Sequence, residues 1–151
     1  MILYFLLAFS LGIEGGYDIP AVGFNDINTG TSFSLTASRH VKFVDMALAL
    51  QASFYTGDNP GYSMNAVGFR VDFYKKNWPV SPVLAVGSDY VIRNLYEASE
   101  NGFAATYAIG FMLNFRVERV HFYPKISYEG FTDLKEHAGF IGLRIGIQYE
   151  I

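Results

Sequence analysis

Three residues of catalytic type, His121, Ser127 and Glu129, lie in one short segment near the C-terminus. A histidine, a serine and a carboxylate are the components of a hydrolase triad, in which the histidine removes the proton of the serine nucleophile. The segment alternates apolar and polar residues, so it predicts a strand, and a strand advances about 3.3 Å per residue. His121 and Ser127 would then lie roughly 20 Å apart, far beyond hydrogen-bonding distance. We therefore expect no enzyme, although a lipid-modifying enzyme stays open as an alternative.

Ligands for a metal or a cofactor are scarce. Asp58 with Asn59, and Asp26 with Asn28, offer oxygen atoms to a calcium ion, but these residue types are also the usual formers of turns. The chain has no cysteine, which excludes thiolate metal sites, thiol catalysis and disulfide bonds. The sequence therefore predicts neither a metal nor a cofactor.

The composition indicates one domain, 1–151, that is rich in apolar residues. Hydrophobic residues make up 51% of the chain, aromatic residues 17% and charged residues only 17%. The net charge of -3 gives no basic surface for nucleic acid. No apolar run reaches the roughly 20 residues that a membrane-spanning helix needs.

The first residues, 1-MILYFLLAFSLG-12, resemble the apolar region of a secretory signal peptide but lack its positively charged start. They continue without a break into an alternating segment, so we interpret about 5–18 as a strand. An export signal is expected to lie upstream of Met1 or to overlap residues 1–12.

The elements that must position the polar residues are strands, because apolar side chains recur at every second position along the whole chain. No stretch has a convincing helical period. The predicted strands are 5–18, 31–39, 45–55, 62–75, 80–92, 103–116, 120–129 and 139–151.

The connections between these strands alternate in character. Longer polar segments, 19–30, 56–61, 93–102 and 131–137, alternate with tight links that concentrate basic residues, at 39–44, 75–79 and 116–119. Loops at one end and short turns at the other predict an all-β, eight-stranded antiparallel up-and-down barrel, which leaves no exposed sheet edge.

Alternation alone does not say which face of the barrel is inside. A soluble lipocalin-like barrel, with its apolar face around a lipophilic ligand, is one alternative. The other face consists mostly of Gly, Ala, Ser and Thr, which suits the narrow interior of eight strands, whereas the apolar face is bulky and nearly free of charge. We therefore predict a transmembrane β-barrel with a small, plugged polar interior and an apolar exterior rich in aromatic residues. Its aromatic girdle is predicted at Tyr17, Phe54, Tyr90, Phe103, Phe115, Phe122 and Tyr128.

Charged residues on the inner face must be paired, since an unpaired charge in a poorly hydrated lumen costs several kcal/mol. Two sets are predicted, and their members are Glu14, Lys125, Glu129 and Arg144 in the first, and Arg70, Asp72, Asp89 and Arg116 in the second. We expect these pairs to fill and close the interior. A narrow or gated path for water and ions is the alternative.

Three segments carry a family resemblance: 15-GGYDIP-20, 78-WPVSPVLAVG-87 and the terminal 138-AGFIGLRIGIQYEI-151. With them, essentially the whole chain resembles the small eight-stranded outer-membrane β-barrels of Gram-negative bacteria, of the OmpA transmembrane-domain and OmpX type. The resemblance implies an integral protein of the bacterial outer membrane with a structural or interaction role. The expected partners are membrane lipid, lipopolysaccharide and other envelope proteins. Specificity is expected in the loops around 24–28 and 94–101.

Overall fold

The computed structural model describes residues 9–23, 27–57, 61–95, 98–132 and 137–151, and all its regular structure is β-strand. No helix in these ranges is long and apolar enough to span a membrane. The strands are β1 Ser10–Val22, β2 Ile27–Val41, β3 Val44–Gly57, β4 Ser63–Tyr74, β5 Val80–Leu95, β6 Ala98–Leu113, β7 Phe115–Val117, β8 Val120–Thr132 and β9 His137–Glu150.

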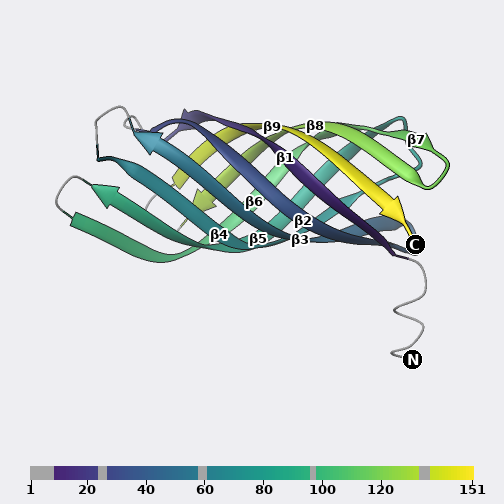
Figure 1. The fold of residues 1–151 in the computed structure, drawn as a ribbon, viewed down its shortest axis with the longest axis horizontal. Helices are drawn as coiled ribbons and strands as arrows, with labels where there is room; N and C mark the ends of the chain where they lie inside the picture. Colours follow the sequence, from purple (N-terminus) through teal and green to yellow (C-terminus); the bar gives the residue numbers. More distant parts are fainter. Residues whose placement is uncertain (1–8, 24–26, 58–60, 96–97, 133–136) are drawn as a thin grey trace, which may run out of the picture.

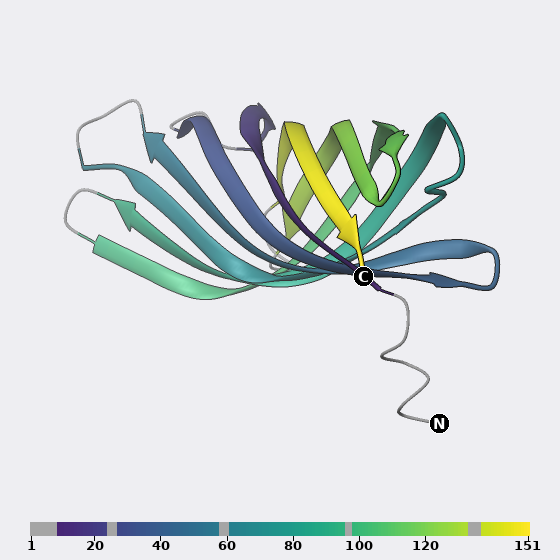
Figure 2. The same ribbon diagram turned by 45° about the vertical axis from the view of Figure 1, so that its right-hand side comes forward.

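The strands form one closed antiparallel barrel. Neighbours in the chain pair in sequence from β1 to β6, while β1 also pairs with β9 and β6 also pairs with β8. The strands are tilted across the molecule (Figure 1), and after a 45° turn β8 and β9 lie on the wall opposite β3 and β4 (Figure 2). The fold class predicted from the alternation is therefore confirmed: the barrel is eight-stranded, with one short extra strand.

The extra strand, β7, continues the wall of β6 after an interruption at Asn114. Both strands pair with β8, through Met112 opposite Lys125 and then Phe115 opposite Phe122. The Asn114 amide Nδ2 donates to the backbone oxygen of Trp78 at 2.6 Å, and its backbone N–H donates to the oxygen of Pro79 at 2.9 Å. These bonds tie β6 to the β4–β5 turn, which explains why the predicted strand 103–116 is interrupted.

The prediction of a loop at 93–102 is wrong, because most of this segment forms strands. β5 continues to Leu95 and β6 begins at Ala98, and the two strands pair without a register shift down to Leu95 opposite Ala98. Two factors stabilise this extension: Arg93 faces Glu100 across the strands, and the Tyr90 hydroxyl donates to Asn101 at 2.8 Å. The hairpin projects beyond the ends of β8 and β9 (Figure 1).

The two faces of the barrel differ as the alternation predicts. Large apolar side chains point outward along most strands, and four of them, Leu35, Leu48, Ile109 and Ile145, are 51% to 63% exposed. The inner face is buried and mostly small or polar. Its members include Ser32, Ser34, Ala47, Ala49, Ser53, Ala66, Ala85, Ala108 and Ser127. Small side chains are needed there because an eight-stranded barrel leaves little space inside.

Several glycines make room for an aromatic ring on the neighbouring strand. Gly146 lies directly opposite Tyr123, and Gly30 lies opposite Tyr55. A Cβ atom at either glycine would collide with the facing ring. Tyr123 and Tyr55 are both buried, so each ring fills part of the interior and packs over the backbone of the glycine that it faces.

Candidate functional site

The centre of the barrel holds a cluster of buried charges, which we call the interior network: Glu14, Asp18, Arg70, Asp72, Lys125, Glu129 and Arg144. They come from β1, β4, β8 and β9, and each is no more than 7% exposed. They meet because alternation points every second side chain of each strand inward, and because the registers place these positions at similar depths. Lys125, for example, lies opposite Arg144, and Arg144 lies opposite Gly16, two residues from Glu14.

Arg70 and Lys125 hold the carboxylates on one side of the network. The Arg70 Nε lies 2.6 Å from the Asp72 carboxylate, and its other nitrogens lie 3.3 Å from Glu14 and 3.5 Å from Glu129. The Lys125 ammonium lies 2.7 Å from Glu14 and 3.4 Å from Asp72. Arg70 and Asp72 of the predicted second set are therefore brought together with the predicted first set in a single network.

Arg144 closes the other side of the network. Its guanidinium lies 2.5 Å from Glu129 and 2.8 Å from Asp18, and it also donates to the Ser32 hydroxyl. Asp18 accepts a further hydrogen bond from the Tyr55 hydroxyl at 3.0 Å. Each carboxylate named here has at least one cation or donor, which is the condition for keeping charges in a poorly hydrated interior.

Asp89, predicted in the second set, lies beside this network. Its carboxylate accepts two hydrogen bonds from the Gln51 amide, at 2.9 and 3.2 Å. Neither Gln51 nor Asp18 was predicted as a member of the site. Asp18 lies on the polar face of the first predicted strand, in phase with Glu14, so the alternation contained its signal. The amide of Gln51 carries no charge, and the pattern of charged residues does not select it.

The prediction that Arg116 lies in the interior is wrong. Its side chain is 53% exposed and lies 2.5 Å from Glu150 at the turn end of the barrel, where Lys76 binds the same carboxylate at 2.7 Å. Arg116 does have the inward phase, opposite His121. It lies in β7, beyond the interruption at Asn114, and the barrel ends there, so the side chain reaches the rim rather than the lumen.

The predicted girdle residues lie on the outer face. Tyr17, Phe54, Phe103, Phe115 and Phe122 are between 42% and 76% exposed, and Tyr90 is 38% exposed. Tyr128 is half-buried, and its hydroxyl contacts His137 Nε2 at 3.0 Å. The ring pairs Tyr90–Phe103 and Phe115–Phe122 mark opposite ends of the barrel wall.

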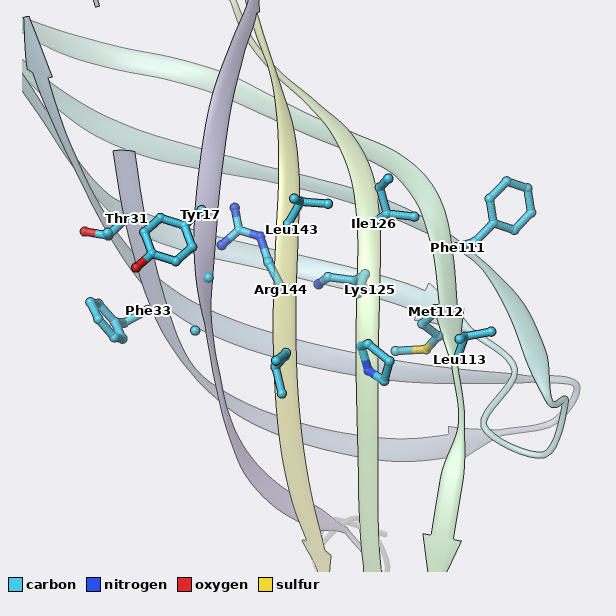
Figure 3. A pocket seen from close by; sticks show the side chains of 14 residues that line it. Tyr17, Thr31, Phe33, Phe111, Met112, Leu113, Lys125, Ile126, Leu143 and Arg144 are labelled. Carbon is cyan, nitrogen blue, oxygen red and sulfur yellow. The ribbon is translucent and has the colours of Figure 1, made fainter. Parts of the chain in front are cut away.

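An apolar groove of about 780 Å³ crosses this outer face over β2, β1, β9, β8 and β6. Gly15 and Pro124, which carry no long side chain, are among its lining residues. Figure 3 shows Tyr17 and Phe33 on one side and Ile126, Phe111 and Leu113 on the other. With its apolar lining, the groove can hold a hydrocarbon chain.

The residues of catalytic type have separate partners. His121 contacts Asn114 through Nε2 at 2.8 Å, whereas the Ser127 hydroxyl donates to Glu129 at 2.8 Å. Within the described ranges no three His, Cys, Asp or Glu side chains are placed to hold a metal ion. Of the acidic pairs considered as calcium ligands, Asp26, Asp58 and Asn59 lie outside the described residues. Most of the predicted specificity loop 24–28 also lies outside them.

The structure is similar to several solved outer-membrane barrels of about the same length. Neisserial surface protein A is 12% identical, with a TM-score of 0.60 and 95% of this chain and 97% of that one covered. The N-terminal β-barrel domain of Pseudomonas aeruginosa OprF is 14% identical (TM-score 0.59; 93% and 97% covered). Ail, the attachment invasion locus protein of Yersinia pestis, is 14% identical (TM-score 0.61; 95% and 98% covered). No protein-family model and no curated protein sequence matches this chain. At these identities the likeness establishes the fold, which is that of the outer-membrane barrels.

Proposed function

We propose that this chain, which has the fold of the small eight-stranded outer-membrane β-barrels, is an integral protein of the bacterial outer membrane with a structural or interaction role. The observation that carries the proposal is the inverted polarity of the barrel. Buried ion pairs such as Arg144–Glu129 lie inside, and large apolar side chains such as Ile145, 58% exposed, lie outside. In water such an exterior would be one continuous adhesive surface, whereas in a bilayer it is the expected surface.

The dimensions of the barrel support a membrane crossing. Its strands other than β7 contain 12 to 16 residues, and a tilted strand needs about 9 to 11 to cross the hydrocarbon core. Closure of the barrel satisfies the backbone groups that lipid cannot. The outer face binds acyl chains of membrane lipid and of lipopolysaccharide, and the groove lined by Gly15 and Pro124 offers space for one.

The interior network favours an anchoring role over transport. Arg70 crosses the lumen from β4 to Glu14 on β1, and Lys125 and Arg144 point inward to carboxylates on other strands. These buried side chains occupy the space through which a solute would pass. Eight strands leave room for little beyond side chains. The alternative of a narrow water and ion path would require these ion pairs to separate.

The interaction role is assigned to the projecting β5–β6 hairpin. Between Ala98 and Ala104, β6 pairs with β5, and its pairing with β8 begins only at Ala105 opposite Thr132. The second edge of this segment is therefore available, among the described residues, for one strand of another envelope protein. Polar side chains at Ser99, Glu100 and Asn101 keep the edge soluble until a partner pairs with it.

Expression without detergent, followed by fractionation and gel electrophoresis with and without boiling, tests the membrane assignment. We expect the chain only in the membrane fraction, with a mobility that changes on boiling, because a closed barrel resists detergent until heat opens it. A soluble monomer that binds a fluorescent fatty acid would contradict the proposal and support the lipocalin-like alternative. Hydrolysis of phospholipid by the purified barrel would support the lipid-modifying alternative.

A further inference from the structure

The two ends of the barrel differ in charge. The turn end carries six cations and three carboxylates, which leaves a formal charge of +3; they are Arg39, Lys42, Lys75, Lys76, Arg116 and Arg119, with Asp45, Glu118 and Glu150. The segments that connect strands at the loop end carry the opposite balance. Their two cations and six carboxylates give -4; they are Arg93 and Lys135, with Asp26, Asp58, Glu97, Glu100, Asp133 and Glu136.

Some turn-end cations are neutralised locally. Lys76 and Arg116 share the Glu150 carboxylate, at 2.7 and 2.5 Å. In contrast, Lys42 and Arg119 are exposed, and the Lys75 ammonium lies 5.9 Å from the centre of the Trp78 ring. Within the described ranges none of these three cations forms a recorded ion pair, so their charge is directed to the surroundings of the barrel.

Each of the three turns also exposes an apolar side chain next to its cation. Phe43 follows Lys42 and is 79% exposed, Trp78 lies beside Lys75 and is 52% exposed, and Val117 lies two residues before Arg119 and is 73% exposed. Lys42 and Glu118 have positive φ values, 54° and 52°, which shape two of these turns tightly. A cation that extends into water beside a side chain that enters the acyl region is the arrangement of an interfacial anchor.

We propose that the turn end binds the headgroups of anionic glycerophospholipids, in the leaflet that these turns face, through Lys42, Lys75 and Arg119. The inference rests on the proposed membrane placement and adds a lipid preference to it. Charge complementarity carries the argument: a basic residue near an anionic leaflet contributes about 1 kcal/mol, or roughly fivefold in local lipid concentration. The loop end, with its excess of carboxylates, lacks this attraction.

The chain contains its own reporter of this contact, because Trp78 is the only tryptophan and lies within the proposed site. The barrel is reconstituted in phosphatidylcholine vesicles that contain a small fraction of either brominated phosphatidylglycerol or brominated phosphatidylcholine, the same fraction in both cases. The bromine atoms lie on the lipid acyl chain, near its headgroup end. Bromine quenches tryptophan only on close approach. We expect phosphatidylglycerol to quench Trp78 about three to five times more effectively at low salt, and the preference to fall as salt screens the charges.

The double variant Lys42→Gln/Arg119→Gln tests the assignment and leaves the Lys75–Trp78 contact in place. We expect it to lose at least half of the preference for phosphatidylglycerol. The matched control, Arg93→Gln/Lys135→Gln, removes the same charge from the loop end and should keep the full preference. Equal quenching by the two lipids, or a preference that the double variant retains, would overturn the inference and leave the membrane placement intact. No quenching by either lipid would contradict the membrane placement itself.

Discussion

Replacing Arg144 with methionine is expected to lower the free energy of unfolding by about 3 to 5 kcal/mol, the usual cost of removing one partner from a buried ion pair. Methionine fills much of the same volume without the charge. Glu129 would lose its contact at 2.5 Å and Asp18 its contact at 2.8 Å, and both carboxylates are buried. The loss is large because removing the guanidinium leaves two buried carboxylates with a charge that is no longer compensated.

Urea-induced unfolding in lipid vesicles measures this change in the free energy of unfolding. The folded fraction at each urea concentration is determined from the gel mobility of the unboiled protein. The control is Arg116→Gln, which breaks an ion pair at a side chain that is 53% exposed and should cost less than about 1 kcal/mol. Equal losses for the two variants would contradict the interior network, because they would mean that Arg144 is as well hydrated as Arg116.

Replacing Ile145 with arginine should destabilise the folded barrel by about 2 to 4 kcal/mol, since this is the cost of an arginine at the bilayer midplane on the lipid face of a barrel. Ile145 is 58% exposed and lies well inside β9, between Gly15 and Pro124 on the neighbouring strands. In a soluble barrel an exposed arginine at this position would cost almost nothing.

The matched control is Val117→Arg, an outward position that is 73% exposed but lies in the β7–β8 hairpin. The cost there should fall to about 0 to 1 kcal/mol, because the guanidinium reaches the headgroups. Both variants are measured by the same unfolding assay in vesicles. A cost that does not depend on depth would mean that the outer face does not lie in hydrocarbon.

The alternation of side chains predicted the barrel, and the bulk and charge of its two faces predicted which of them lies inside. Phe111 and Leu113 lie outside and Met112 lies inside because the period of a strand is two, and this holds whatever the long-range contacts are. The predicted strands 45–55 and 80–92 agree closely with β3 and β5 at their turn ends. Each is longer in the structure at the loop end.

The strand ends were less predictable because different forces act there. Segment 93–102 is polar and contains Gly102, as loops do, yet its extension is stabilised by pairing such as Ile92 with Asn101. The interruption at Asn114 depends on the backbone oxygens of Lys75 and Trp78, which lie far away in the sequence. Neither long-range contact leaves a periodic signal.

The charges of the interior could be predicted, but their pairing could not. The inward phase selected Glu14, Arg70, Lys125 and Arg144, and all four lie in the network. Which carboxylate each cation contacts depends on strand register and on side-chain length, so Arg70 reaches Glu14 across the barrel from β4 to β1. The register is fixed by the whole barrel, and no single strand contains it.

The most direct test of the account is whether the outer face of β9 lies in hydrocarbon. Because the chain has no cysteine, a single cysteine introduced at Ile141, Ile145 or Tyr149 can carry one spin label. These three positions follow one another along the outer face from the loop end to the turn end. In vesicles, we expect the ratio of the label's collision rate with oxygen to its collision rate with a water-soluble nickel complex to be highest at Ile145 and to decrease toward both ends. Nickel accessibility that is high and equal at all three positions would show that this face lies in water, and would contradict the account.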